Sequence, residues 1–322
     1  MKAVVQDRYG SADVLHFEDI SAPEMGDDDV LVHVVAAGVD RGAWHFMTGQ
    51  PYLMRVLGFG FRAPNSRVPG TNIAGRVETA GKHVTRFNVG DEVYGTCKGA
   101  FAEYACAHED KLAPKPVRFS FEQAAVTPYA GYVAWQAVHD HGHLHEGETV
   151  LVVGASGAVG TFVVQIAKAA GADVTGVCSS TKTELVTSLG ADRVIDYTQD
   201  DFADGHRHYD LVIDIGGRTP VSQLRWALTK HGRLVIAGGE GDRWIGGIQR
   251  QLWASILSPL VSQKLGAFVV KENAEYLQRL NELVDTGKLA PVIDRAYPLS
   301  EAPDAVRRLD DPQARGRTVI TI

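Results

Sequence analysis

Residues 150–160 read Val-Leu-Val-Val-Gly-Ala-Ser-Gly-Ala-Val-Gly, an apolar run that enters a glycine-rich turn. The run 149–153 has the length and composition of a strand that is buried on both faces. The mostly apolar stretch 160–170 follows the turn at once and predicts a helix. Strand, turn and helix in direct succession predict the first unit of a Rossmann-type parallel sheet.

The small residues of this turn predict what it binds. Gly157 lets the backbone approach a pyrophosphate, and Gly160 lets the helix pack closely on the sheet. The helix N-terminus adds unpaired amides and partial positive charge. Ala155 stands where the dinucleotide fingerprint usually has its first glycine. A plain turn of small residues is the alternative, but the complete strand–turn–helix context favours a dinucleotide that contacts Ala155, Ser156, Gly157, Ala158 and Val159.

The end of the next predicted strand, 172–178, bears on the choice between the two nicotinamide cofactors. NAD-specific sites place an acidic residue ~20 residues beyond the glycines, where it binds the ribose 2′-hydroxyl. Here the strand ends in Ser179-Ser180-Thr181-Lys182, and no carboxylate follows before Glu184. Hydroxyls and a lysine suit a 2′-phosphate. A solvated surface turn is the alternative; we predict NADP(H), bound through Ser179, Ser180 and Lys182.

The pattern around the glycine turn alternates between strands and helices. Ser120 and Gln123 predict a capping box that opens a helical stretch before it. Strands are predicted at 149–153, 172–178, 193–195, 210–215 and 233–237, with helices at 160–170, 182–189 and 221–228. This alternation predicts an α/β, doubly wound parallel sheet with helices on both faces.

Residues 1–115 have a different character. Short apolar runs such as 30–37 and 73–80 are separated by glycine and proline, as in a β-barrel or sandwich. The chain has 322 residues, and at about 150 residues per domain that length predicts two domains. The sequence therefore predicts a β-rich domain and a Rossmann domain in one chain.

The charge and cysteine content exclude several classes of protein. The net charge of −7 disfavours nucleic acid as a partner, although Arg55, Arg62 and Arg67 leave a local basic patch open. Three cysteines do not make a disulfide framework and fit a reducing compartment. The start of the sequence lacks the apolar stretch of a signal peptide, and no run of 18 apolar residues occurs. We expect a cytoplasmic protein with no membrane segment.

Five further motifs carry a family resemblance. They are Ala36–Asp40, Pro69–Gly75, Val89–Tyr94, Gly99–Tyr104 and Leu189–Tyr197. With the glycine turn, they make the whole chain resemble the medium-chain dehydrogenase/reductase superfamily, and most closely its zinc-free quinone oxidoreductase and enone reductase branch. The resemblance implies a GroES-like β-barrel catalytic domain made of residues 1–121 and 269–322. The Rossmann domain, residues 122–268, is inserted between these parts, and the active site is expected where the two domains meet.

The resemblance also allows a test for zinc. The ligand positions of zinc-dependent members fall on Asp40, Thr71, Asn72 and, at or near it, Val126. A catalytic zinc needs three nitrogen, sulfur or carboxylate ligands, and only Asp40 qualifies. Histidines also alternate at positions 139, 141, 143 and 145, but they fall in a polar connection that we interpret as a solvated loop. We therefore predict no metal.

The resemblance implies specific site residues. Asp40 stands where the branch usually has an asparagine facing the nicotinamide; either it acts in the reaction or Arg41 holds it. His45 matches a position that relays protons in several zinc-dependent members, so Asp40 and His45 are the catalytic candidates. The predicted pocket residues are Trp44, Tyr52, Tyr129 and Trp244. The other predicted cofactor contacts are Tyr197, Ile236, Ala237, Gly238, Phe268, Val269 and Arg317.

The predicted function follows from the missing metal. Without a Lewis acid, alcohol oxidation lacks the usual way to stabilise an alkoxide. Reduction of a conjugated carbonyl needs only hydride, a hydrogen-bond donor for the enolate oxygen and a proton. We predict a homodimeric, zinc-independent, NADPH-dependent reductase of quinones or α,β-unsaturated carbonyls. The alternatives are a zinc-free NADP-dependent alcohol dehydrogenase or aldehyde reductase, and a catalytically silent nicotinamide-binding redox sensor.

Overall fold

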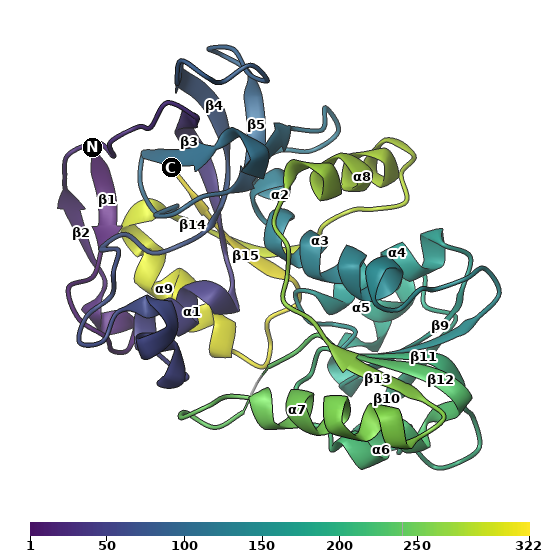
Figure 1. Cartoon of the computed structure of the whole chain (residues 1–322). Coiled ribbons are helices and arrows are strands. Elements are labelled where there is room, and N and C mark those ends of the chain that lie inside the picture. The colour runs from purple at the N-terminus through teal and green to yellow at the C-terminus, as the bar shows by residue number, and fades with distance from the viewer. Residues whose placement is uncertain (240) are drawn as a thin grey trace. The chain divides into compact units, whose positions relative to one another are not determined.

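The computed structural model describes residues 1–239 and 241–322, which form two compact units (Figure 1). The barrel unit comprises Met1–Tyr129, Glu272–Asp285 and Ala290–Ile322. The Rossmann unit comprises Ala130–Lys271 and Thr286–Leu289. The Rossmann unit contains one six-stranded sheet, and the barrel unit contains a two-stranded and a seven-stranded sheet.

The sheet of the Rossmann unit has six strands, all parallel, in the order β10-β9-β8-β11-β12-β13. Its strands are β8 Thr149–Val153, β9 Asp173–Cys178, β10 Arg193–Asp196, β11 Tyr209–Asp214, β12 Leu228–Ile236 and β13 Lys264–Ala267. The chain runs outward from β8 to β10 and then returns to β11 on the other side of β8. The predicted doubly wound parallel sheet is confirmed, and β8 and β11 flank its switch point, where such sheets bind ligands.

Helices and helical turns precede or connect these strands. They are α3 Pro128–Trp135, η4 Gln136–Asp140, α4 Gly160–Ala169, η5 Ser180–Lys182, α5 Thr183–Ser188, α6 Val221–Trp226, α7 Ile248–Leu257 and η6 Ser258–Leu260. Helix α4 is buried from Gly160 through Ala167, as expected of a helix packed between the sheet and its neighbours. The apolar sequence of this helix therefore reflects its central place in the unit.

The barrel unit is built mainly of antiparallel strands. They are β1 Lys2–Val5, β2 His16–Asp19, β3 Asp29–Val39, β4 Asn72–Ala80, β5 Glu92–Thr96, β6 Tyr104–His108, β7 Leu112–Pro114, β14 Ile293–Pro298 and β15 Arg317–Thr321. The main sheet has the order β14-β15-β3-β4-β5-β7, with β6 also paired to β3. Because β15 pairs antiparallel with β3, the last strand of the chain completes a sheet that begins near residue 29.

Most helical elements of the barrel unit are short. They are η1 Ala12–Val14, α1 Arg41–Thr48, η2 Arg55–Phe59, η3 Glu109–Lys111, α2 Phe121–Ala125, α8 Ala274–Asp285, η7 Leu299–Glu301, α9 Ala302–Arg307 and η8 Arg308–Asp310. The predicted capping box of α2 is confirmed, with Ser120 and Gln123 each bonding the other's backbone amide. No helix within the described ranges is long and apolar enough to cross a membrane.

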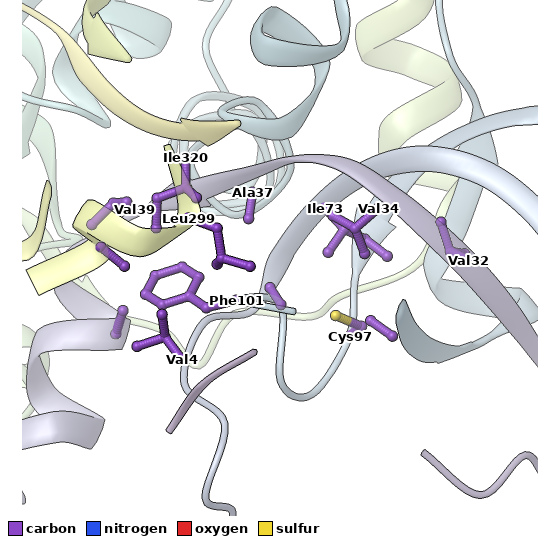
Figure 2. Packing of buried hydrophobic residues seen from close by; sticks show 14 of the residues in the cluster. Val4, Val32, Val34, Ala37, Val39, Ile73, Cys97, Phe101, Leu299 and Ile320 are labelled. Atoms are coloured by element: carbon purple, nitrogen blue, oxygen red, sulfur yellow. The ribbon is translucent and has the colours of Figure 1, made fainter. Parts of the chain in front are cut away.

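One hydrophobic core joins the two ends of the chain in the barrel unit. Figure 2 shows the Phe101 ring among Val4, Val39 and Leu299, with Ile320 of β15 close by. All of these side chains are buried. The core therefore depends on residues near both termini, which explains why the C-terminal segment belongs to this unit.

Helix α2 also belongs to the barrel unit, although the predicted boundary after residue 121 assigned most of it to the Rossmann domain. It packs on β3 and β4. The approach is tight at Gly38, where an added Cβ would lie 2.4 Å from the carbonyl oxygen of Ala125. Contact with the barrel sheet, rather than its place in the sequence, thus decides where this helix belongs.

Candidate cofactor-binding and active-site residues

The glycine turn follows β8 directly. Gly154 has a left-handed φ of 87°, and its amide and that of Ala155 donate to the carbonyl of Val177 at 3.1 and 3.0 Å. At Gly160, an added Cβ would lie 2.1 Å from the carbonyl oxygen of Gly154. Only glycine fits there, because α4 begins in direct contact with the turn.

The turn has the chemistry that a pyrophosphate needs. No described residue accepts a hydrogen bond from the amides of Ser156, Ala158 or Val159. Unpaired amides at the start of a helix attract anions, since they carry the positive end of the helix dipole. These amides precede a helix of ten residues at the switch point of the sheet. The amides of Ser156, Ala158 and Val159 therefore fit a dinucleotide phosphate, and contact of the cofactor with residues 155–159 stays a prediction.

The second predicted cofactor segment, Ser179–Lys182, forms a helical turn at the end of β9. Parallel pairing sets Asp196 of β10 opposite Cys178, and the amide of Tyr197 donates to the Cys178 carbonyl at 3.1 Å. Tyr197 is 61% exposed. The structure thus brings Tyr197 next to the turn that holds Ser180 and Lys182, and its contact with the adenosine stays a prediction.

Asp196 is a residue that the sequence analysis missed. Its carboxylate accepts a hydrogen bond from the Ser180 hydroxyl, and it also accepts from Thr198 Oγ1 at 2.8 Å. The turn itself contains no carboxylate before Glu184, but β10 supplies one from the neighbouring strand. The register of β10 against β9, which only the structure shows, places Asp196 at this turn.

The predicted nicotinamide residues Ile236, Ala237 and Gly238 lie at the end of β12. The amides of Ala237 and Gly238 donate to the carbonyl of Asp214 at 2.9 and 3.0 Å. An added Cβ at Gly238 would lie 2.1 Å from the carbonyl oxygen of Ile215. This segment therefore runs close against the end of β11, with no space for a side chain at Gly238.

An ion pair that was not predicted from the sequence lies at the end of β11, at the carboxyl end of the sheet. Arg250 of α7 donates to the fully buried carboxylate of Asp214 at 2.5 Å. Burial raises the pKa of Asp214, and the bond from Arg250 opposes that increase. The pair attaches α7 to the carboxyl end of the sheet.

Phe268 and Val269 follow β13 and differ in their surroundings. The Phe268 ring stacks on His141, with ring centroids 4.4 Å apart. Val269 is 90% exposed.

The histidines at 139–145 do not form a metal site. The ring of His139 packs against that of Trp135, with ring centroids 4.4 Å apart. No group of three or more metal-ligating side chains occurs among the described residues.

In the barrel unit, Asp40 is the N-cap of α1 and is only 5% exposed. One carboxylate oxygen accepts from the amide of Ala43 at 2.9 Å, and the other accepts from Asn72 Nδ2 at 2.6 Å. Arg41 donates to Asp310 at 2.6 Å. Of the two alternatives for Asp40, the one in which Arg41 holds it differs from the structure: Asn72 and the helix N-terminus hold it, because Asn72 starts the strand that pairs with the end of β3.

Asn72 joins Asp40 to the predicted pocket residue Tyr129. Its Oδ1 accepts from the amide of Tyr129 at 2.9 Å. Burial, reinforced by the negative charges of Asp40 and Glu272, raises the pKa of Tyr129 to about 12. The Tyr129 hydroxyl therefore stays protonated at neutral pH and is able to donate a hydrogen bond.

Arg317 is buried in β15 rather than on the surface, with 2% of its surface exposed. Its Nε and Nη2 have no hydrogen-bond partner among the described residues. Burial lowers its pKa, and the charge of Asp40 opposes that change. A buried guanidinium with spare donors favours a nearby anion; its contact with the pyrophosphate stays a prediction.

His45 lies on α1, with Nδ1 2.7 Å from the carbonyl oxygen of Gln50. Because a carbonyl only accepts, Nδ1 carries a proton, and Nε2 is the nitrogen left for chemistry. The ring of Trp44 meets His45 edge-on at 5.1 Å. The bond to Gln50 thus fixes the tautomer of His45, and the contacts with Gln50 and Trp44 fix the orientation of its ring.

The remaining pocket candidates have defined local contacts. The Arg55 guanidinium lies over the rings of Tyr9 and Tyr52 at 4.2 and 4.6 Å. Arg67 pairs with Asp7 and Glu18. Trp244 is largely exposed in the segment before α7. Arg55 and Arg67 are therefore engaged within the chain, which weakens the case for a nucleic-acid patch.

Comparison with known proteins agrees with this geometry. Residues 26–117 match the family described as alcohol dehydrogenase GroES-like domain, and residues 189–320 match the family described as zinc-binding dehydrogenase. The chain is 33% identical to a 2-methylene-furan-3-one reductase of Solanum lycopersicum, covering 99% of this chain and 79% of the relative. It is 32% identical to a chloroplastic NADPH-dependent alkenal/one oxidoreductase of Arabidopsis thaliana, with the same coverage.

A solved structure supports the same assignment. The quinone oxidoreductase from Coxiella burnetii superposes with a TM-score of 0.86 at 27% identity, covering 100% of this chain and 99% of that chain. A Rossmann unit, a GroES-like barrel and relatives named as oxidoreductases define an NAD(P)-dependent oxidoreductase. The chain belongs to the medium-chain dehydrogenase/reductase superfamily, in its quinone oxidoreductase and enone reductase branch.

Proposed function

We propose that this protein uses NADPH to reduce quinones or α,β-unsaturated carbonyls without zinc. The observation that carries the proposal is the Asp40–Asn72 pair. The carboxylate is already engaged by Asn72 and a helix amide, at the positions where zinc-dependent members hold metal ligands. Relatives named as enone and quinone reductases support the substrate class.

The cofactor supplies one part of the chemistry, since a reduced nicotinamide, when bound, provides the hydride that the β-carbon of the substrate accepts. An α,β-unsaturated carbonyl then carries negative charge on its carbonyl oxygen and takes up one proton at the α-carbon, whereas a quinone takes up the proton on oxygen to give the hydroquinone. We assign stabilisation of that oxygen to the Tyr129 hydroxyl, which stays protonated at neutral pH. A neutral donor fixed before the reaction is worth more than a mobile solvent molecule.

His45 is the proposed proton donor. Since Nδ1 is bonded to the Gln50 carbonyl, transfer takes place from Nε2 when the ring is doubly protonated. The bond to Gln50 holds the ring in place during this transfer. We assign Asp40 a positioning role, because both of its carboxylate oxygens accept hydrogen bonds from the chain.

The preference for NADPH over NADH rests on Lys182 and on the hydroxyl of Ser179, at the turn that also holds Ser180. A relative named as NADPH-dependent supports this preference.

We also propose a homodimer, because β13 is an edge strand and several exposed apolar side chains lie nearby on α7 and η6: Leu252, Trp253, Ile256 and Leu260. Light scattering of the purified protein tests that assembly. A cytoplasmic location fits three unpaired cysteines, and cell fractionation tests it.

A matrix of substrates and cofactors tests the function. Purified enzyme is assayed for nicotinamide oxidation with a quinone, an enone and an aldehyde, each with NADPH and NADH, before and after exhaustive chelation with metal analysis. We expect turnover of the quinone or enone with NADPH, unchanged by chelation. Turnover of the aldehyde alone favours the zinc-free alcohol dehydrogenase. Cofactor binding without turnover favours the redox sensor. Loss of turnover restored by stoichiometric zinc contradicts zinc independence.

A further inference from the structure

The end of β10 carries a negative charge beside the predicted ribose-binding turn. Asp196 closes β10 and lies opposite Cys178 of β9 in the parallel register. The next helical turn of the chain, Ser180–Lys182, starts two residues beyond Cys178. Ser180 is exposed and Asp196 is partly exposed, so solvent and ligands reach both side chains.

Both oxygens of this carboxylate are engaged. Oδ2 accepts a hydrogen bond from the Ser180 hydroxyl. Oδ1 accepts from the amide of Thr198 at 3.0 Å and from Thr198 Oγ1 at 2.8 Å. These bonds favour the charged form and fix the carboxylate in place.

This arrangement changes what Ser180 offers to a ligand. A hydroxyl has a single proton, and Ser180 gives it to Asp196. Its oxygen is then left as an acceptor, which suits a ribose 2′-hydroxyl but not a phosphate oxygen. The charge of Asp196 also repels a 2′-phosphate, which carries up to two negative charges of its own.

Lys182, in the same turn, acts in the opposite direction. Its ammonium group attracts a 2′-phosphate and is indifferent to a hydroxyl. The turn therefore combines one group that favours NADPH with one that limits it. Selectivity is a difference of affinities, and a repulsive element contributes to it as much as an attractive one.

We infer that Asp196 is a specificity-determining residue that restrains the preference for the 2′-phosphate, so that the turn accepts both NADPH and NADH. The inference rests on the proposed binding of a nicotinamide dinucleotide at this turn. It extends that proposal because it names the residue that sets the balance between the two cofactors.

Direct binding to adenosine fragments isolates this effect from turnover. The probes are adenosine 2′,5′-bisphosphate and adenosine 5′-monophosphate, which differ only in the 2′-phosphate. Calorimetry gives both dissociation constants for the wild type, for Asp196→Asn and for Asp200→Asn. Asp200 is the matched control, because it lies on the same exposed segment and its substitution removes the same charge.

We expect Asp196→Asn to bind the bisphosphate roughly fivefold more tightly, the size of effect of one exposed charge at close range. Binding of the monophosphate should stay within about twofold, and Asp200→Asn should resemble the wild type. Weaker binding of the bisphosphate by Asp196→Asn, or no change, overturns the inference. An equal gain in Asp200→Asn also overturns it, because net charge would then explain the effect.

Failure of the proposed function would look different. If neither fragment binds to any variant although NADPH-dependent reduction proceeds, the turn does not hold the ribose, and the inference alone is lost. If the fragments behave as expected but no quinone or enone is reduced, the inference stands and the proposed reaction is wrong. A thermal melt of each variant confirms that Asp196→Asn is folded, and Asp196→Ser repeats the test with a smaller side chain.

Discussion

The glycine turn of the Rossmann unit and the Asp40 site of the barrel unit are built in different ways. The turn uses consecutive residues and presents backbone amides, which need no particular side chain at Ser156, Ala158 or Val159. The Asp40 site joins side chains from separate segments, with Asn72 bonded both to Asp40 and to Tyr129. The difference teaches that the proposed binding of the phosphates depends on backbone shape, whereas the proposed chemistry depends on side chains placed by tertiary contacts.

The largest expected effect is on turnover in the barrel unit. We expect His45→Gln to lower kcat by ~10²–10⁴, the usual contribution of a general acid or base. The dissociation constant for NADPH should not change. Steady-state kinetics and fluorescence binding measure both quantities, with His83→Gln, an exposed histidine of the same unit, as the control. If kcat stays within about threefold of the wild type, solvent supplies the proton and His45 has no catalytic role.

Tyr129→Phe should have the next largest effect. Removal of one donor to a developing oxyanion typically lowers kcat by ~10²–10³. The deficit should be constant between about pH 6 and 9, because the pKa of Tyr129 is raised to about 12 and its hydroxyl does not titrate in that interval.

Tyr104→Phe serves as the control for this substitution, since Tyr104 lies elsewhere in the barrel unit, on β6. The measurement is the pH profile of kcat for both variants. A deficit that appeared only at high pH would show that the hydroxyl titrates within the interval, against the expectation of a fixed neutral donor.

Gly160→Ala tests the glycine turn of the Rossmann unit, where backbone shape is expected to matter. The added methyl would lie 2.1 Å from the carbonyl oxygen of Gly154, so the turn must shift. Overpacking of this kind typically costs ~1–3 kcal/mol of stability. We expect a lower melting temperature and weaker NADPH binding. At Gly266 an added Cβ meets no atom within 4 Å, so Gly266→Ala is the control. Similar losses in both variants would show that glycine content matters rather than the close approach.

Lys182→Ala should have the smallest effect of the four. A charge-assisted hydrogen bond contributes ~1.5–3 kcal/mol, which corresponds to about a tenfold or larger increase in the dissociation constant for NADPH. Binding of NADH should be nearly unchanged. Lys230→Ala, which removes a lysine from β12, is the control. Equal losses for both cofactors would mean that this turn does not contact the 2′-phosphate.

Local features that are formed by residues close in sequence were predicted well. The glycine turn and the capping box at Ser120 and Gln123 occur as expected, because each depends on contacts within one or two turns of chain. The short helix at 41–48 and the strand at 293–298 were not predicted. They are short, and packing in the barrel unit, rather than a long periodic pattern, stabilises them.

The sequence by itself determined the α/β class, the glycine turn between the first Rossmann strand and its helix, and the family. Strand and helix periodicity and glycine spacing are local properties, so they can be observed along one chain. Only the tertiary structure showed that Asn72 rather than Arg41 holds Asp40, that Arg317 is buried, and that Asp196 lies beside Ser180. Those contacts depend on the register of paired strands and on burial, which bring together residues that no local pattern connects.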